Sequence, residues 1–97
     1  MIAYRFLLPA EEEMTEAAVF YEAVSPRLGS DFLGDVQRGI DLVRGQPSIG
    51  RNVGQGLRRM LLHKFPFSLI YALGAEEIVI VAVAHQKRRP DYWKGRL

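Results

Sequence analysis

The sequence predicts a single α+β domain with the element order β-α-α-β-β-β, in which a small antiparallel sheet packs against an N-terminal pair of helices. Two segments with helical periodicity occupy the first half of the chain, and three short apolar runs separated by turn signals occupy the second half. A length of 97 residues suits one hydrophobic core and no second one. Residues 1–97 are therefore expected to form one domain.

The first strand and the first helix meet at Pro9. Residues 2–8 (IAYRFLL) are rich in β-branched, aromatic and aliphatic types, which predicts a strand. Pro9 opens the helix because its fixed φ suits a first helical turn. The helix is expected to end before Ser25, since the residue ahead of a proline avoids the α region. Four side chains have the spacing of one buried helix face: Met14, Ala17, Ala18 and Tyr21.

A second helix is expected to start with Ser30 as its N-cap and to end at Gly45 and Pro47. It joins the first helix through a short turn and forms an αα-hairpin with it. Its core face is predicted from spacing to contain Phe32, Val36, Ile40 and Val43. Without a nearby histidine, its acidic positions indicate a solvated face rather than a metal site: Asp31, Asp35 and Asp41.

The second half of the chain predicts a three-stranded meander. Residues 48–56 (SIGRNVGQG) are glycine-rich but lack the Gly-Lys-Ser/Thr ending of a phosphate-binding loop, so a mobile loop is expected. Strands are predicted at residues 57–64, 67–73 and 77–84. The last of these is apolar on both faces, which places it in the middle of the sheet.

Composition limits the classes of function. The chain has no cysteine, so disulfides, thiolate metal sites and a cysteine nucleophile are excluded. The N-terminus does not have the pattern of a signal peptide and no apolar run is long enough to span a membrane, so a cytoplasmic protein is expected. Residues 1–56 hold 5 Lys/Arg and 8 Asp/Glu, whereas residues 57–97 hold 8 and 3, so the C-terminal part favours an acidic partner.

The segment after the last strand is both basic and aromatic. A lone tryptophan at Trp93 is expected to pack back onto the domain, because one such ring buries about 150–250 Å². Tyr92 is expected to help it pin the tail, and Pro90 to fix a turn or a first helical turn. The cations left available to a partner are predicted to be Lys87, Arg88, Arg89, Lys94 and Arg96.

Four sequence words in order carry a resemblance to a known group of proteins: YEAVSPRLGSDFLGDV, QPSIG, LRRMLLHKFPFSLIY and IVIVAVAHQKRRPDYW. Together they resemble the RelE/ParE superfamily, the toxins of type II toxin–antitoxin modules, over residues 4–96. The resemblance implies the RelE/ParE-like fold and a growth inhibitor that a cognate antitoxin neutralises. It implies no cofactor and no metal.

The resemblance also implies a surface for the antitoxin, whose disordered C-terminal segment folds as it wraps around the toxin. Candidate apolar anchors are Phe20 and Val24 on the first helix and Leu33 on the second, which lie off the core faces. The alternative is that these faces are wide and the three side chains are core. Operator DNA is expected to bind only through the antitoxin.

The superfamily divides by target, and this sequence favours the ParE-like branch, which binds DNA gyrase and stalls it on cleaved DNA. The alternative branch cuts messenger RNA on the ribosome. For such a nuclease the candidates are His85 as base, Arg59 as phosphate ligand and Tyr92 as stacking or acidic group. Binding of the target or of its phosphates is expected from the basic residues Arg58, Arg59, Lys87, Arg88, Arg89, Lys94 and Arg96.

The sequence departs from the nuclease pattern. Ser68 stands three residues before Tyr71, where nuclease members tend to carry an arginine, and Gln86 rather than a tyrosine follows His85. Losing a cation that stabilises the transition state typically costs several kcal/mol. The sequence therefore favours an inhibitor over an enzyme, and a degenerate member that only binds its antitoxin is a third alternative.

Overall fold

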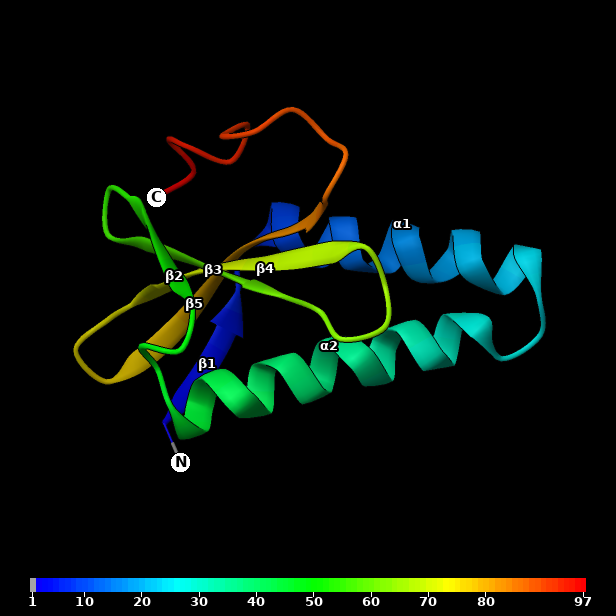
Figure 1. The fold of residues 1–97 in the computed structure, drawn as a ribbon, viewed down its shortest axis with the longest axis horizontal. Coiled ribbons are helices and arrows are strands. Elements are labelled where there is room, and N and C mark those ends of the chain that lie inside the picture. The colour runs from blue at the N-terminus through cyan, green and yellow to red at the C-terminus, as the bar shows by residue number, and fades with distance from the viewer. Residues whose placement is uncertain (1) are drawn as a thin grey trace.

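The computed structural model describes residues 2–97 and contains two helices and five strands (Figure 1). In chain order the elements are β1 (Ala3–Phe6), α1 (Leu8–Val24), α2 (Leu28–Gly45), β2 (Arg51–Gly54), β3 (Leu57–Leu61), β4 (Phe67–Leu73) and β5 (Glu77–His85). The α+β class and the helical hairpin are as predicted. One strand, β2, was not predicted.

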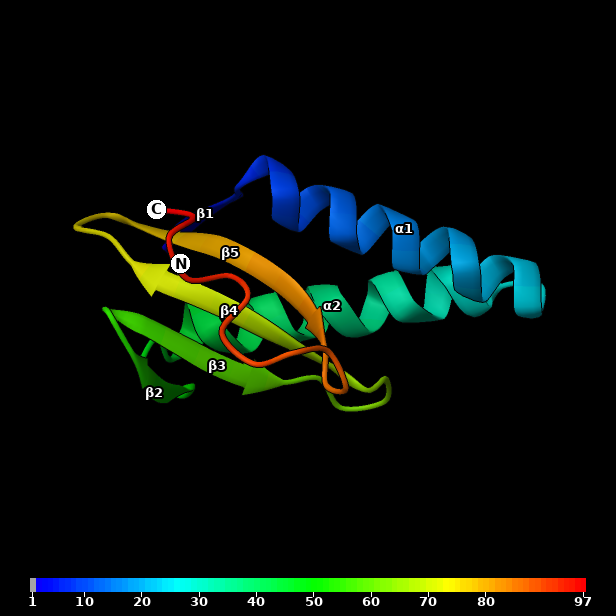
Figure 2. The ribbon, with the colours of Figure 1, turned by 90° about the horizontal axis from the view of Figure 1, so that it is seen from above.

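The five strands form one sheet in the order β1-β5-β4-β3-β2. The pairs β2–β3, β3–β4 and β4–β5 are antiparallel, whereas β1 pairs with β5 in parallel. The central position predicted for the last strand is confirmed, because β5 is hydrogen-bonded on both sides. Figure 2 shows α2 passing behind the sheet while the C-terminal segment crosses in front of it.

The sheet therefore has two different faces. One face of the sheet packs against the apolar faces of α1 and α2, and the buried side chains between them are called the helix-side core. Its fully buried side chains include the predicted α2 face of Phe32, Val36, Ile40 and Val43 together with Leu69, Tyr71, Ile78, Ile80 and Val83. The predicted α1 side chains pack against it as half-buried members. The helical periodicity in the sequence thus identified the buried faces correctly.

The turn between the helices differs from the prediction. Helix α2 begins at Leu28 after Arg27, whose φ of 71° is left-handed, so Ser30 lies inside the helix and is not its N-cap. The Glu22 carboxylate of α1 instead accepts hydrogen bonds from the N–H groups of Arg27 and Gly29, at 3.1 and 3.0 Å. A Cβ on Gly29 would lie 2.6 Å from the carbonyl oxygen of Ala18, so the close helix contact requires glycine there.

The predicted loop at residues 48–56 contains the edge strand β2. Gly54, Gln55 and Gly56 all have positive φ, and they turn the chain from β2 into β3. A glycine-rich composition predicts a mobile loop, but it also suits a tight hairpin of this kind. The strand predicted at residues 57–64 is correspondingly shorter and ends at Leu61.

Asp35 is buried rather than part of a solvated helix face. Its side chain is 1% exposed and pairs with Arg38 at 2.8 Å. Its other oxygen accepts hydrogen bonds from the N–H groups of Lys64 and Phe65, at 2.8 and 3.0 Å. The aspartate therefore holds the loop after β3 against α2, a long-range role that helix spacing cannot reveal.

Tyr71 fixes the segment between α2 and β2. Its hydroxyl donates to the carbonyl oxygen of Pro47 at 2.7 Å and accepts from the N–H of Gly50 at 2.9 Å, inside the core. We expect Tyr71→Phe to lower the free energy of unfolding by about 1–3 kcal/mol, because the buried N–H of Gly50 loses its acceptor. Urea unfolding measures this. Tyr4→Phe, whose hydroxyl has no hydrogen bond within residues 2–97, should change it by at most about 0.5 kcal/mol, and an equal loss in both variants would contradict the role.

Candidate functional site

The C-terminal segment, residues 86–97, covers the sheet face opposite the helices and is called the tail. Trp93 is only 5% exposed and packs with residues of three strands, including Leu57, Ile70 and Val79. We call this second cluster the tail-side cluster; its other buried members are Val81, Ala82 and Ala84. The structure confirms the expectation that Trp93 anchors the tail.

The path of the tail is set by turns rather than by a helix. Asp91, with a φ of 67°, and Gly95, with a φ of 88°, take left-handed conformations that reverse the chain. The N–H of Lys94 donates to the carbonyl oxygen of Asp91 at 3.1 Å, and that of Arg96 donates to Trp93 at 3.2 Å. This short coil brings Trp93 onto the sheet and directs Arg96 toward α1.

Glu13 of α1 binds the tail and β5 together. Its carboxylate accepts hydrogen bonds from the two terminal nitrogens of Arg96 at 3.0 and 2.9 Å and from the hydroxyl of Tyr92 at 2.8 Å. It also accepts from the N–H of Val83 at 3.1 Å, and Arg88 lies 3.5 Å away. Arg96 is thus an internal partner of Glu13 rather than a free cation.

The same contacts shift the ionisation of this cluster. Desolvation raises the pKa of Glu13, but the hydrogen bonds from Arg96, Tyr92 and Val83 outweigh it and hold the pKa below the ordinary 4.5. The pKa of Tyr92 is raised above the ordinary 10.0, first by burial and then by its bond to the Glu13 carboxylate. A charged Glu13 and a neutral Tyr92 are therefore the stable forms near neutral pH.

The structure brings two of the three nuclease candidates, Arg59 and His85, to the lining of one small hollow under the tail, and Tyr92 is not part of that lining. Arg59 pairs with Ile70 in the sheet register and lies on the tail side, since Ile70 belongs to the tail-side cluster. The ring of His85 packs against that of Phe67, a helix-side residue, with centroids 5.0 Å apart. Tyr92 is bonded to Glu13 and has the Arg88 guanidinium 3.8 Å above its ring. The hydroxyl of Tyr92 is therefore engaged by Glu13, whereas Arg59 and His85 line a common hollow.

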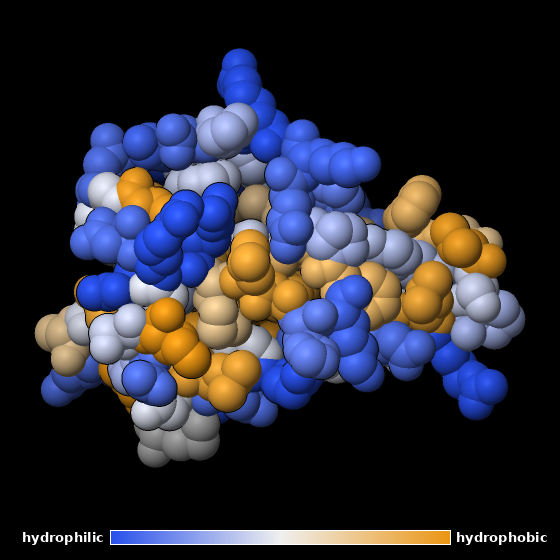
Figure 3. All heavy atoms as spheres, viewed as in Figure 1, coloured by the Kyte–Doolittle hydropathy of each residue, from blue (hydrophilic) through white to orange (hydrophobic). Residues whose placement is uncertain are grey.

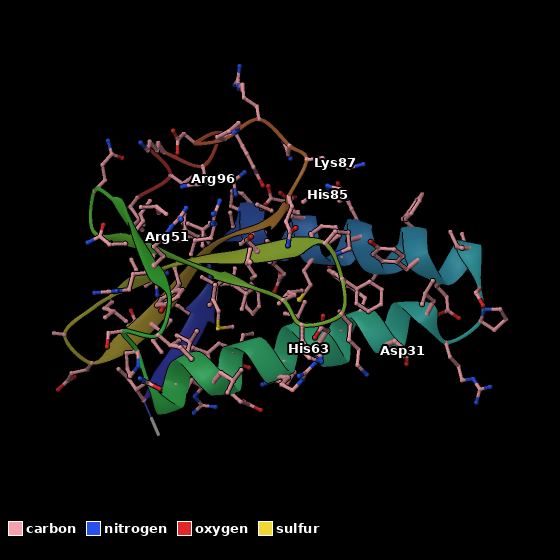
Figure 4. The ribbon with its side chains drawn as sticks, viewed as in Figure 1. Asp31, Arg51, His63, His85, Lys87 and Arg96 are labelled. Carbon is pink, nitrogen blue, oxygen red and sulfur yellow. The ribbon has the colours of Figure 1, made fainter. Side chains whose placement is uncertain are left out.

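His85 also has a local partner. Its Nδ1 accepts a hydrogen bond from the N–H of Lys87 at 3.0 Å, so the hydrogen of the neutral ring lies on Nε2. Figure 4 shows His85 at the end of β5 beside Lys87, while Arg96 lies toward the other end of the tail. This bond shapes the turn that follows the strand.

The other predicted cations fall into two groups. Arg58 donates to the carbonyl oxygens of Gly50 and Ser48, at 2.7 and 3.3 Å, and so supports the segment before β2. Lys94 pairs with Asp91 at 3.6 Å. Lys87 and Arg89 are exposed and form no salt bridge within residues 2–97.

Arg51 was not among the cations predicted to bind the target. Arg51 of β2 is the direct cross-strand partner of Arg59 on β3. Arg51 is exposed and Arg59 half-buried, and in the described chain neither side chain has a hydrogen bond or salt bridge. Only the β2–β3 pairing, which the glycine-rich composition concealed, could have shown that the two arginines are neighbours.

The three candidate antitoxin anchors are exposed: Phe20 by 63%, Val24 by 63% and Leu33 by 42%. They are therefore not core residues. Figure 3 shows apolar surface over the far ends of α1 and α2. Beside Phe20, a groove of about 360 Å³ runs between α1 and the ends of β4 and β5, and Ala17 and Phe67 line its apolar part.

No group of three or more His, Cys, Asp or Glu residues in the described part of the chain is placed to hold a metal ion. Neither helix found in residues 2–97 is long and apolar enough to cross a membrane.

Comparisons with known proteins identify the family. Residues 4–90 match the family described as "ParE toxin of type II toxin-antitoxin system, parDE". The solved structure "Chromosomal ParDE TA system from P. aeruginosa" has a similar fold, with a TM-score of 0.64 and 20% identity over 88% of this chain and 96% of that chain. A comparison with curated proteins found no match. Since the family match spans nearly its whole length, this chain belongs to the ParE toxin family of type II toxin–antitoxin systems.

Proposed function

We propose that the protein arrests growth by binding DNA gyrase and poisoning it on cleaved DNA, without catalysing a reaction itself. The observation that carries this proposal is the anchored tail. Trp93 and its neighbours fill the sheet face that bears Arg59 and Ser68. Of the residues proposed for a nuclease, Tyr92 is engaged by Glu13 and does not line the hollow that Arg59 and His85 share, and a covered surface suits recognition of a protein.

The direct test of this proposal is a supercoiling assay with purified gyrase and relaxed plasmid. We expect the purified toxin, freed of antitoxin, to abolish supercoiling at a stoichiometric excess. Unchanged supercoiling at large excess would contradict the proposal. If overexpression of the soluble toxin without antitoxin is also harmless, the third alternative, a member that only binds its antitoxin, is the better account.

His85→Ala separates the gyrase proposal from the nuclease alternative. We expect growth arrest to persist in this variant, because the ring packs on Phe67 and its Nδ1 already accepts the N–H of Lys87, so the neutral ring has no free acceptor nitrogen for a general base. Arrest is measured by colony counts after induction, with thermal unfolding as a check that the variant is folded. Loss of toxicity in a stably folded variant, by the roughly 100-fold or more that removal of a general base causes, would instead support RNA cleavage.

We further propose that the cognate antitoxin covers the apolar end of the helical hairpin. An antitoxin segment that folds on binding could place an apolar helix along Phe20, Val24 and Leu33. Because these side chains are exposed in the free toxin, covering them removes apolar area from water without disturbing its core. The groove beside Phe20 offers a continuation of this contact toward β5.

Phe20→Ala combined with Val24→Ala tests this surface. We expect the double variant to weaken antitoxin binding by about 2–4 kcal/mol, the range of hot-spot truncations, while its unfolding free energy changes by less than about 1 kcal/mol. Calorimetric titration with the antitoxin measures the affinity. Leu42→Ala, a similarly exposed leucine farther along α2, is the control and should leave the affinity within about 0.5 kcal/mol. An unaffected affinity in the Phe20/Val24 variant would place the antitoxin elsewhere.

A further inference from the structure

The Arg51–Arg59 pair is an unusual arrangement for a sheet. Like charges directly opposite one another on neighbouring strands repel and destabilise the pairing. Among the residues of the described chain, no carboxylate relieves this pair, although Glu13, Asp35, Glu77 and Asp91 each neutralise other cations. An anion from outside the chain would turn the repulsion into a binding contribution.

A small hollow adjoins Arg59 between the sheet and the tail. It measures about 50 Å³, and Arg59, Ser68, Arg88 and Trp93 are among its lining residues, none of which is acidic. The indole Nε1 of Trp93 is buried and has no acceptor in the part of the chain that is described.

The size and chemistry of this region favour phosphate over an acidic protein segment. A hollow of 50 Å³ admits about three water-sized groups, which suits the oxygens of a phosphate but not an apolar side-chain anchor. Guanidinium groups are particularly suited to phosphate because of their planar donor geometry. Contact with a nucleic-acid backbone needs charge and donors rather than anchoring pockets.

Duplex DNA fits better than a single strand. Proteins that bind single strands stack the bases on exposed aromatic rings. Here Trp93 is buried, and the ring of Tyr92 is already covered by Arg88. The tail that overlies this face adds the exposed cation Arg89, which supplies positive charge without a stacking platform.

We propose that Arg51 and Arg59 form a phosphate-binding site for the backbone of duplex DNA. The site binds DNA directly and without regard to sequence. The inference goes beyond the proposed function and does not require gyrase, although in a gyrase complex the same contacts would hold the toxin against the DNA.

The test is fluorescence anisotropy of a labelled short DNA duplex titrated with the toxin alone, at several salt concentrations between about 50 and 200 mM. The variant Arg51→Gln/Arg59→Gln keeps the side-chain length but removes both charges. The matched control is Arg27→Gln/Lys64→Gln, which removes two exposed charges from the hairpin turn and the loop after β3.

We expect the Arg51/Arg59 variant to bind DNA at least about tenfold more weakly, with a salt slope smaller by about 2, and the control to change affinity less than about threefold. Absence of binding by the wild-type protein at low salt, or equal losses in both double variants, would overturn the inference. So would tighter binding to poly-glutamate than to DNA, which would assign the surface to an acidic protein. None of these outcomes depends on gyrase, so this site and the gyrase proposal can fail separately.

Discussion

Glu13→Ala is expected to lower the free energy of unfolding by about 3 kcal/mol. The carboxylate, whose side chain is 13% exposed, accepts bonds from Val83, Tyr92 and Arg96. Its removal leaves a largely buried guanidinium and two further donors without an acceptor, and breaking a buried pair in this way typically costs about 3–5 kcal/mol. The lower end applies because Arg96 is 19% exposed and water can partly replace the acceptor. Urea unfolding of both proteins measures the difference.

Glu16→Ala is the matched control for this prediction. Glu16 lies on the same helix, is exposed, and has no hydrogen bond or salt bridge within the described chain. Its replacement should change the unfolding free energy by no more than about 0.5 kcal/mol. A loss of similar size in both variants would show that the effect belongs to helix charge and not to the bonds between Glu13 and the tail.

The same carboxylate makes stability depend on pH. Because its pKa in the folded state is below the ordinary 4.5, its contribution is complete above pH 4.5 and is lost as the pH falls through the folded-state value. We therefore expect the difference in unfolding free energy between wild type and Glu13→Ala to shrink as the pH is lowered from 7 into the acid range. A difference that stays constant down to pH 3 would be inconsistent with a depressed pKa.

Trp93→Ala is expected to lower the free energy of unfolding by about 3–5 kcal/mol, the usual range for a buried aromatic truncated to alanine. The ring is 5% exposed and joins strands β3, β4 and β5 to the tail, so its loss opens a cavity and releases the segment. We expect trypsin to cut rapidly after Lys87 or Arg88 in the variant and slowly in the wild type. Mass spectrometry of the fragments identifies the cut.

Trp93→Phe is the control for this second prediction. It keeps an aromatic ring in the tail-side cluster and removes an N–H that has no acceptor among residues 2–97. The cost should therefore be clearly smaller than that of alanine, about 1–2 kcal/mol. Equal losses in both variants, or a tail that resists trypsin in Trp93→Ala, would mean that the ring does not anchor the segment.

Much of the fold could be predicted because it depends on patterns within short segments of the sequence. The stripe from Phe32 to Val43 repeats every three or four residues, and the apolar run of β5 marks a central strand. Strand β2 was missed because Gly54 and Gly56 suggest a loop, whereas its pairing depends on β3. The start of α2 was misplaced because Glu22, from the preceding helix, does the capping that Ser30 was expected to do.

The site was harder to predict, since its key contacts join residues far apart in the sequence. Glu13 belongs to an acidic first helical turn, which alone indicates a favourable helix dipole and no partner. Only the folded chain brings it to Arg96, 83 positions away. The basic tail was likewise predicted to be available as a whole, but the structure engages Arg96 and Arg88 with Glu13 and leaves Lys87 and Arg89 exposed.

Measuring cleaved DNA tests most directly whether this ParE family member poisons gyrase without catalysing a reaction, as proposed. Purified gyrase and supercoiled plasmid are incubated with increasing toxin, and the trapped complexes are released with detergent and protease. We expect the amount of linear DNA to rise with toxin concentration and to stay low when the cognate antitoxin is added first. No linear DNA at large excess of a correctly folded toxin would contradict it.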